Sequence, residues 1–450
     1  MATESRSQAY TLVVGLGMTG LSVVRYLLSR GEYIVVADSR DIPPMRGEFK
    51  QHYPDIPLHT GAFEPALFTG AARIIISPGV PLDEPAVLAA RDKGIDIIGD
   101  IDLFAHVVDK PVIAITGSNG KSTVTALLTD MLTAGGMHAE MGGNIGTPVL
   151  ELLDKPADIY VLELSSFQLD TLDALPMLAA TVLNVSEDHM DRYASFESYA
   201  SSKLGIYDNA RFAVINRDDQ VARAHPGKAI GALEFTLSEP MPGQYGIRQI
   251  GEGQCLCHGD DVLVAMDDLH IRGEHNAANA LAAMALFDTA ASVAQLDRAA
   301  AIAAMCAFKG LSHRTQWVAS IDGCEWFNDS KATNVGAAVA AVTGLSGMKV
   351  LIAGGTGKDA DFSGLAEIAP AHFRGVVLIG RDAPLIEAVL GDLVPVKHAT
   401  SMCDAVNVAA ALAETGDSVL LSPACASFDM FDSYAHRGDE FIRCVQELSS

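Results

Sequence analysis

Short apolar runs, each followed by a turn signal and a helical pattern, recur along the chain from residue 10 onward. Residues 10–14 form the first apolar run and residues 33–37 the second, and between them apolar side chains recur at helical spacing through residues 21–28. Further runs follow at 72–76 and 95–98. This alternation of strands and helices is typical of a parallel α/β sheet.

The same alternation restarts after residue 110 and again beyond Gly310. The expected central strands are at 111–115, 159–162, 180–183 and 212–215, and an alanine-rich helix is expected at 276–287. The polar stretch before that helix contains Gly, Pro and Asp, which mark loops. The expected last strands are at 349–353, 376–379 and 418–421. The pattern therefore predicts an α/β protein with three domains, covering residues 1–99, 100–310 and 311–450.

Composition supports a folded, multidomain protein. A chain of 450 residues is long enough for two to four domains at about 100–200 residues each. Hydrophobic residues make up 49% and charged residues 19%, as in packed globular domains. The formal net charge of -25 repels nucleic acid and anionic membranes, so we expect neither as a partner. An anionic substrate would need local positive charge.

The seven cysteines are scattered and odd in number, which favours reduced thiols in a cytoplasmic protein. Cys255 and Cys257 lie close together beside His258, but no second ligand pair follows, so two thiols in a strand are expected rather than a zinc site. The N-terminus lacks an apolar signal core, and no apolar run reaches the roughly 18 residues of a membrane-spanning helix.

Glycines follow the first strand in the order Gly15-Leu-Gly17-Met-Thr-Gly20, and the second strand ends at Asp38. This is the dinucleotide fingerprint, in which glycines let the backbone approach a pyrophosphate at a helix N-terminus. The first domain is therefore expected to be Rossmann-like. A nicotinamide-dependent dehydrogenase is one hypothesis that the fingerprint leaves open.

A phosphate loop follows the strand at 111–115. The sequence Thr116-Gly-Ser-Asn-Gly-Lys-Ser-Thr123 places backbone N–H groups, a helix N-terminus and an ammonium around one phosphate chain. Ile115 stands where the standard pattern has its first glycine, and Gly117 supplies flexibility two residues later. The central domain is expected to resemble P-loop ATPases, with Lys121 on the β and γ phosphates and Ser122 or Thr123 reaching Mg²⁺. The loop residues expected to bind ATP are Gly117, Ser118, Asn119, Gly120, Lys121, Ser122 and Thr123.

Two further strand ends carry polar side chains. Glu163 ends the strand at 159–162, where Mg²⁺ often finds a carboxylate, although a solvated loop residue would fit the position as well. The strand at 180–183 is followed by a polar segment that contains His189. A lone histidine is more often a structural hydrogen-bonding group than a ligand.

Several motifs in sequence order resemble the Mur ligases of bacterial cell-wall synthesis. They are Thr116–Thr123, Glu163-Leu-Ser-Ser-Phe-Gln168, Glu187-Asp-His-Met-Asp-Arg-Tyr193 and Gly273-Glu-His-Asn-Ala-Ala-Asn279. Asn328-Asp-Ser-Lys-Ala-Thr-Asn334 and Leu421-Ser-Pro-Ala-Cys-Ala-Ser427 resemble the branch that adds D-glutamate. The resemblance covers essentially the whole chain and implies a UDP-substrate domain, a central ATP-binding domain and a Rossmann-like C-terminal amino-acid domain.

The resemblance also implies a role for each matching residue. It implies contacts to the UDP substrate for Met18, Thr19, Asp38, Ser39, Arg40, Ser77 and Asn144. For ATP it adds Asn276 and Asn279 near adenine, Asp329 at the ribose and Arg314 at the γ-phosphate. It implies two Mg²⁺ ions, with Ser122 and Glu163 at the first, and with His189 and a carbamylated Lys203 at the second. The implied catalytic set is Lys121, Glu163, His189, Lys203 and Arg314.

A D-glutamate pocket is implied in the last domain. Its residues are Lys331, Thr333, Lys358, Ser427, Phe428 and Tyr434, although Tyr434 stands where phenylalanine is familiar and Phe428 where an aliphatic is. Two lysines and two hydroxyls would replace the water around a dicarboxylate amino acid. From the sequence alone, Lys203 would be interpreted as an exposed helical lysine.

The implied activity is the ATP-dependent joining of D-glutamate to UDP-N-acetylmuramoyl-L-alanine through an acyl phosphate, by a monomer. The alternatives are the dehydrogenase, another Mur-type or folylpolyglutamate-type ligase, and a non-catalytic ATP-binding regulator. The N-terminal Rossmann-like domain disfavours the folate ligase.

Overall fold

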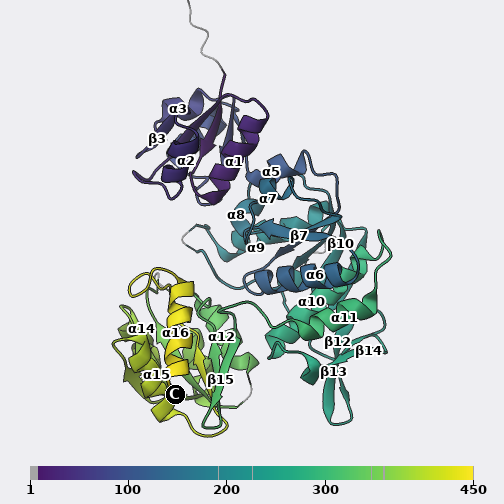
Figure 1. The fold of residues 1–450 in the computed structure, drawn as a ribbon, viewed down its shortest axis with the longest axis vertical. Coiled ribbons are helices and arrows are strands. Elements are labelled where there is room, and N and C mark those ends of the chain that lie inside the picture. Colours follow the sequence, from purple (N-terminus) through teal and green to yellow (C-terminus); the bar gives the residue numbers. More distant parts are fainter. Residues whose placement is uncertain (1–8, 191, 225–226, 346, 358–359, 449–450) are drawn as a thin grey trace, which may run out of the picture.

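The chain forms three units, each built on its own sheet and arranged one after another (Figure 1). This computed structural model describes residues 9–190, 192–224, 227–345, 347–357 and 360–448. The N-terminal sheet has five strands, the central sheet nine and the C-terminal sheet six. The fold class predicted from the sequence is confirmed.

The N-terminal sheet has the strand order β3-β2-β1-β4-β5, and all of its strands are parallel. This is the doubly wound order of dinucleotide-binding folds. Every residue of β1 and β2 is buried, because helices cover both faces of the sheet. The elements of this unit are β1 (Thr11–Val14), α1 (Met18–Ser29), β2 (Ile34–Asp38), α2 (Arg46–His52), β3 (Leu58–Thr60), α3 (Pro65–Thr69), β4 (Arg73–Ile76), α4 (Pro85–Asp92) and β5 (Asp96–Ile98).

Two glycines of the fingerprint are required by close packing between β1 and α1. Gly15 has a φ of 94°, and a Cβ there would lie 2.8 Å from the Cβ of Ser77. A Cβ on Gly20 would lie 1.8 Å from the carbonyl oxygen of Gly15. Only glycine lets the strand, the turn and the helix approach this closely.

The central sheet has the order β14-β13-β12-β11-β10-β9-β6-β8-β7, parallel from β7 to β12 and antiparallel from β12 to β14. Its inner strands alternate between two cores. In β6, Ile113 and Ile115 face the cluster that includes α6, α10 and α11, whereas Val112 and Ala114 face the cluster on the other side. The sheet is therefore buried on both faces, as its nearly continuous apolar strands require.

The elements of the central unit begin with α5 (Asp100–Ala105), β6 (Val112–Thr116), α6 (Lys121–Ala134), β7 (Ala139–Gly143), α7 (Val149–Leu152), β8 (Ile159–Glu163), α8 (Ser166–Leu169), β9 (Met177–Val182) and α9 (Phe196–Leu204). They continue with the 3₁₀ turn η1 (Gly205–Asn209), β10 (Ala210–Asn216), η2 (Ala222–Ala224), β11 (Gly231–Phe235), β12 (Tyr245–Ile250), β13 (Gly253–His258), β14 (Asp261–Ala265), η3 (Met266–Asp268), α10 (Glu274–Ala290) and α11 (Arg298–Ala307).

The C-terminal sheet has the order β15-β16-β20-β17-β18-β19, and only the β15/β16 pair is antiparallel. Helices α12 and α13 pack into the apolar cluster on one face, and α15 and α16 pack into the cluster on the other. The elements are β15 (Gln316–Ile321), β16 (Cys324–Asn328), α12 (Val335–Gly344), β17 (Lys349–Gly354), α13 (Ser363–His372), β18 (Phe373–Ile379), α14 (Ala383–Leu390), β19 (Val396–His398), α15 (Met402–Leu412), β20 (Ser418–Leu421) and α16 (Tyr434–Leu448).

Every strand expected from the apolar runs is present, with ends shifted by a few residues. The region before α10 differs from the expectation, because strands β11 to β14 replace most of the expected loops. Polar residues suit that region because the strands β13 and β14 are only partly buried. No helix in the described part of the chain is long and apolar enough to cross a membrane.

The cysteines are only partly as expected. Cys255 and Cys257 lie in β13, as predicted for two thiols in a strand. The expectation that all the thiols are reduced is wrong for Cys403 and Cys444, which form a disulfide between α15 and α16. The two cysteines are 41 positions apart in the chain, so their pairing could not be inferred from local spacing.

Candidate functional site

The phosphate loop joins β6 to α6 as the sequence predicted. Gly117 and Gly120 have φ values of 150° and 84°, which favour glycine. The N–H of Ser118 donates to the carbonyl of Asn184 at 2.9 Å, and the N–H of Asn119 donates to the Asn184 side chain at 2.8 Å. The loop is thus held against the end of β9, with the N-terminus of α6 behind it.

Lys121 folds over this loop. Its ammonium donates to the carbonyl oxygens of Gly117 at 2.7 Å and Ser118 at 2.9 Å. Burial lowers the pKa of Lys121, the carboxylate of Glu163 opposes that shift, and Arg314 adds to it. The Lys121 ammonium therefore lies where the phosphates of a bound nucleotide would replace these two carbonyl oxygens as its hydrogen-bond acceptors.

Ser122, Glu163, Asn144 and Arg314 form one hydrogen-bonded cluster at the first turn of α6. The Ser122 hydroxyl donates to Glu163 Oε2 at 2.6 Å, and Asn144 Nδ2 donates to Glu163 Oε1 at 2.7 Å. Arg314 Nη2 donates to Ser122 Oγ at 2.7 Å from the segment that precedes β15. A carboxylate, a hydroxyl and an amide oxygen form the all-oxygen donor set that Mg²⁺ prefers, so the residues present fit this ion.

Lys203 is the second buried lysine of the site. It is 2% exposed, its ammonium donates to the Gly117 carbonyl at 3.0 Å, and it lies 4.7 Å from the centre of the Tyr199 ring. Burial, with the nearby charge of Lys121, lowers its pKa to about 7. The expectation of an exposed lysine, made from its position on a helix alone, is wrong. A neutral amine at this position is nucleophilic, which is what a reaction with carbon dioxide requires.

The segment between β9 and α9 contacts all three units. Asp188 accepts a hydrogen bond of 3.3 Å from Asn334 of the C-terminal unit. Arg192 donates to the carbonyl of Gly79 in the N-terminal unit at 3.4 Å, and its guanidinium lies 4.5 Å from the centre of the Phe167 ring. The Asp188 carboxylate also raises the pKa of Lys121 and Lys203 against the larger effect of burial.

His189 lies in this segment with a φ of 57°, an unusual conformation for a residue with a side chain. Its ring centre is 4.9 Å from that of Phe167, and Nε2 is 3.7 Å from the Asp188 carboxylate. These contacts orient the ring, and the role of His189 as a metal ligand stays a prediction.

Asn276 and Asn279 are buried in the first turns of α10. Asn276 donates to the carbonyl of Arg272 at 2.9 Å, and Asn279 donates to Asn276 at 3.1 Å. A Cβ on Gly120 would lie 2.5 Å from Asn279 Oδ1, so the phosphate loop and α10 are in contact. The structure brings the two expected adenine contacts to the edge of the phosphate loop.

Asp329 is buried in the C-terminal unit. It accepts hydrogen bonds from the Thr315 N–H at 3.0 Å and the Ser422 hydroxyl at 2.8 Å. Burial raises its pKa to about 7, although those hydrogen bonds and Arg314 oppose the shift. Thr315 Oγ1 also lies 3.4 Å from Nε2 of His275 in α10. Asp329, the expected ribose contact, is therefore next to a contact between the C-terminal and central units.

The expected UDP-substrate residues of the N-terminal unit gather near the carboxyl ends of its strands. Asp38 accepts from the Leu16 N–H at 2.7 Å and from the Arg40 side chain at 2.7 and 2.8 Å. Burial raises the pKa of Asp38, but the hydrogen bonds from Arg40 and Leu16 outweigh it and lower the pKa overall. Ser77 donates to the Gly15 carbonyl at 3.3 Å, whereas Met18 is 62% exposed beside the glycine turn and Ser39 is also exposed.

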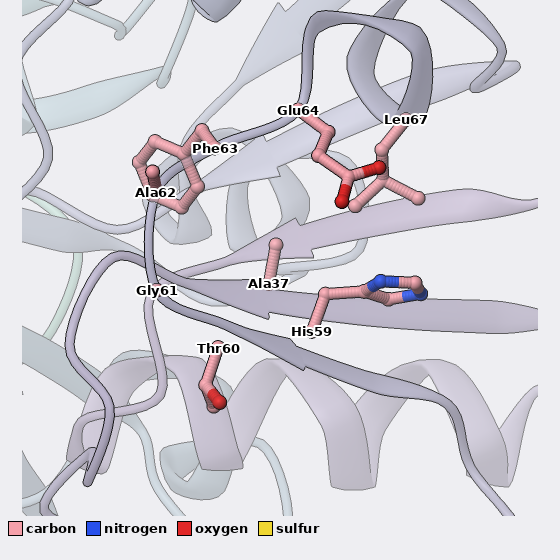
Figure 2. A pocket seen from close by; sticks show the side chains of 8 residues that line it. All are labelled: Ala37, His59, Thr60, Gly61, Ala62, Phe63, Glu64 and Leu67. Atoms are coloured by element: carbon pink, nitrogen blue, oxygen red, sulfur yellow. The ribbon is translucent and has the colours of Figure 1, made fainter.

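A cavity of about 130 Å³ lies against Ala37, near the end of β2 (Figure 2). Ala37 forms its floor, and the segment from His59 to Leu67 surrounds it. Thr19 is the second residue of α1, the helix that follows the glycine turn. Asn144, the remaining residue expected to bind the UDP substrate, lies apart from this group and contacts Glu163 in the central unit.

The expected D-glutamate residues are only partly brought together. The Lys331 ammonium lies 4.0 Å from the centre of the Tyr434 ring, while Ser427 is 2% exposed and Phe428 is 74% exposed. Thr333 is half-buried between Lys331 and α12. Lys358 lies outside the described residues.

Arg437 holds this region together and was missed by sequence reasoning. It is 1% exposed and donates to Ser330 Oγ at 2.9 Å, to the Ser330 carbonyl at 2.8 Å and to the Cys425 carbonyl at 3.1 Å. Asp188 and Arg192 were also missed, although both belong to the motif that contains His189. No local signal distinguishes Arg437 from the other charged residues of α16.

Three family models match the chain in order. Residues 9–99 match the model described as Mur ligase MurD-like, N-terminal domain; residues 115–287 match Mur ligase middle domain; and residues 313–425 match Mur ligase, glutamate ligase domain. Together the three matches cover most of the chain.

Curated relatives match over nearly their full length. A protein of Nitrosococcus oceani is 48% identical over 445 residues, covering 98% of this chain and 97% of its own. A protein of Marinobacter nauticus is also 48% identical over 445 residues, with coverage of 98% and 99%. Both are named UDP-N-acetylmuramoylalanine--D-glutamate ligase.

Solved structures share the fold. A pseudomurein peptide ligase type C from Methanothermus fervidus has a TM-score of 0.61 at 18% identity, covering 98% of this chain and 100% of its own. The UDP-N-acetylmuramate-alanine ligase MurC from Thermotoga maritima has a TM-score of 0.60 at 17% identity, with coverage of 98% and 99%. At such identities the similarity shows the architecture alone.

Proposed function

This chain belongs to the Mur ligase family of ATP-dependent amide ligases, and we propose that it joins D-glutamate to UDP-N-acetylmuramoyl-L-alanine in peptidoglycan precursor synthesis. The relatives that match it over nearly the whole chain bear the name of that reaction. The observation that carries the proposal is the cluster of Ser122, Glu163, Asn144 and Arg314 beside the phosphate loop.

The proposed reaction has two chemical steps. The carboxylate of the alanyl substrate forms a bond to the γ-phosphorus of ATP, and the bond from that phosphorus to ADP breaks. The amine of D-glutamate then forms the amide bond at the acyl carbon, inorganic phosphate leaves, and the amine loses a proton. Holding three substrates on three units makes the second step effectively intramolecular, which lowers its entropic barrier.

The phosphate loop would hold ATP at the end of β6. Gly117 to Thr123 supply N–H groups and hydroxyls, and Lys121 supplies the charge on the β and γ phosphates. Asn276 and Asn279 would contact adenine, and Asp329 the ribose. Arg314 would stabilise charge on the transferred phosphoryl group, because it already reaches Ser122.

Two Mg²⁺ ions are proposed. Ser122 and Glu163 would hold the first, and His189 with a carbamylated Lys203 would hold the second. When bound, these ions offset the repulsion between a carboxylate and a polyphosphate. The pKa of about 7 supports a carbamate on Lys203, because the amine is then largely neutral at slightly alkaline pH. A carbamate turns a cation into an anionic oxygen ligand.

The remaining proposals concern the domains that bind each substrate, the oligomeric state and the location in the cell. Residues 1–99 would bind the UDP substrate through Met18, Thr19, Asp38, Ser39, Arg40 and Ser77, with Asn144 near its pyrophosphate, and residues 100–310 would bind ATP. Residues 311–450 would bind D-glutamate through Lys331, Thr333, Lys358, Ser427, Phe428 and Tyr434. The enzyme would act as a monomer in the cytoplasm, where ATP and nucleotide sugars are available.

The test is phosphate release with UDP-N-acetylmuramoyl-L-alanine, ATP, Mg²⁺ and a panel of D- and L-amino acids. We expect a response to D-glutamate alone. Exclusive response to another acceptor would overturn the D-glutamate assignment but keep the ligase. Absence of release with every acceptor would instead favour the non-catalytic reading.

A further inference from the structure

The disulfide between Cys403 and Cys444 joins the two helices that cover one face of the C-terminal sheet. Cys403 is the second residue of α15, and Cys444 lies in the C-terminal half of α16. Their Cα atoms are 5.1 Å apart, within the range that disulfides span. No other disulfide occurs among the described residues. The pair has no role in the ligase chemistry proposed above.

The disulfide lies on the same buried face of α16 as Arg437. Arg437, Phe441, Cys444 and Val445 are all buried, at spacings of four, seven and eight residues along the helix. Phe441, Cys444 and Val445 belong to the core cluster that contains Met402 and Ala405 of α15. The bond therefore fixes α16 against α15 two helical turns away from Arg437.

Arg437 links α16 by hydrogen bonds to the region expected to bind D-glutamate. Its guanidinium holds the Ser330 and Cys425 carbonyls, and the Ser330 hydroxyl donates to the carbonyl of Tyr434, the first residue of α16, at 2.7 Å. Ser330 immediately precedes Lys331, which contacts the Tyr434 ring. Movement of α16 would thus shift the two segments that carry Lys331 and Ser427.

The disulfide is accessible only from the side of Cys403. Cys403 is half-buried and lines a cavity of about 280 Å³ with Met430, Phe431 and Arg443. Arg443 Nη2 lies 3.2 Å from the sulfur of Cys403 and 3.5 Å from that of Cys444. A guanidinium at this distance would stabilise a thiolate on either residue once the bond opens. Cys444 is 3% exposed, so an external reagent meets Cys403 first.

We propose that Cys403 and Cys444 are a reversible redox site that controls how firmly α16 is held, and through it the D-glutamate site. In the oxidising direction, the Cys403 thiolate attacks a low-molecular-weight disulfide such as oxidised glutathione and releases one thiol. The Cys444 thiolate then attacks the Cys403 sulfur and releases the second thiol. Two protein thiols lose two electrons, the reagent gains them, and the two protons end on the released thiols.

A metal site is the alternative chemistry for the same atoms. Cys403, Cys444 and Glu447 offer ligand atoms within 4.8 Å of one another. Arg443 opposes a cation there, because its guanidinium lies against both sulfurs and also pairs with Glu447 at 2.6 Å. The surroundings therefore favour the dithiol–disulfide pair.

The test equilibrates the full-length enzyme in buffers of varied reduced-to-oxidised glutathione ratio. Thiols are alkylated, and peptides are analysed by mass spectrometry. We expect Cys403 and Cys444 to become linked and protected together, reversibly, while Cys306 stays alkylated. Hydrogen exchange should speed up in α16 on reduction, including around Arg437. The part of this inference that concerns D-glutamate rests on the proposed function. Thiol protection and hydrogen exchange do not depend on catalysis, so they distinguish failure of the redox inference from failure of the proposed function.

The functional readout compares the two redox forms. We expect KM for D-glutamate to rise about threefold on reduction while KM for ATP stays constant, the pattern of weakened binding of one substrate. Cys403→Ser and Cys403→Ala should behave as the reduced enzyme in every buffer, and Cys306→Ser should respond like the wild type. Thiols that stay alkylated in oxidising buffer, stoichiometric zinc on the reduced enzyme, or identical exchange of α16 in both forms would each overturn the proposal.

Discussion

The guanidinium of Arg314 donates a hydrogen bond of 2.7 Å to the hydroxyl of Ser122, 192 residues earlier in the chain. The Ser122 hydroxyl in turn donates a hydrogen bond of 2.6 Å to the carboxylate of Glu163. A cation of the C-terminal unit therefore lies at the N-terminus of α6, where the phosphates of ATP are proposed to bind. The C-terminal unit thus contributes a positive charge to this site.

Replacing Arg314 with alanine should slow phosphoryl transfer. We expect kcat to fall about 10²–10³-fold, the usual effect of removing one preorganised donor to developing charge. KM for the UDP substrate should change little, because its expected contacts lie in other units. Single-turnover ADP formation measures the step, with Arg217→Ala on the central surface as the control. Wild-type turnover by Arg314→Ala would refute the role.

Glu163→Gln should raise the Mg²⁺ concentration needed for activity. Glutamine keeps the size of the side chain but removes the charge, and its NH₂ group would face Ser122 or Asn144, which both donate to Glu163. We expect at least about a tenfold increase in the half-saturating Mg²⁺ concentration, judging by the effect of changes around metal ligands. The matched control is the exposed Glu252→Gln. An unchanged Mg²⁺ titration would exclude Glu163 as a ligand.

Lys203 should make stability depend on pH. Its pKa is about 7 in the folded state, against an ordinary value of 10.5. Between these values the unfolded chain binds a proton that the folded chain has lost, so the free energy of unfolding contributed by this group rises with pH. Below about pH 7 the buried amine of Lys203 is protonated in the folded protein, and this buried charge lowers the free energy of unfolding.

Lys203→Met should remove that dependence. The variant should gain stability relative to the wild type at pH 6, and the difference should shrink toward pH 9. Urea unfolding followed by circular dichroism at each pH measures this, with the exposed Lys93→Met as the control. A constant difference across the range would show that Lys203 does not titrate there. A ¹³C carbamate signal from the wild type in labelled bicarbonate, absent in Lys203→Met, would test the modification itself.

Asp38→Asn should weaken binding of the UDP substrate. The carboxylate accepts from Leu16 and Arg40 and fixes the turn between β1 and α1. We expect KM for the UDP substrate to rise about tenfold with kcat nearly unchanged, because charge-assisted hydrogen bonds contribute about 1.5–3 kcal/mol. Initial rates at saturating ATP and D-glutamate measure this, and the exposed Asp55→Asn is the control. A lower kcat at constant KM would contradict a binding role.

The same residue should affect stability in acid. The pKa of Asp38 is lowered in the folded state, so the stability that its carboxylate contributes is present above the ordinary value of 3.8. That contribution is lost as the pH falls through the lower folded pKa. Asp38→Asn should therefore lose stability at neutral pH but show a smaller further loss in acid than the wild type.

Local patterns in the sequence were enough to find most of the buried parallel strands and the loops that end them, but not the strands β3, β7, β15, β16 and β19. The run before Gly15 and the run before Gly117 are continuous apolar strands, because both faces of their sheets are covered. Of the antiparallel strands β12–β14, only a strand at Cys255 and Cys257 was expected, because these strands are partly buried and lack that continuous apolar pattern.

The sequence by itself determined the order of the three α/β units and the phosphate loop, since these depend on residues that are neighbours in the chain. Only the tertiary structure brought Arg314 to Ser122, buried Lys203 beneath Gly117 and paired Cys403 with Cys444. These contacts join distant segments, so they depend on how the helices and sheets pack. The pKa of Lys203 likewise follows from burial, which the sequence around a helical lysine does not encode.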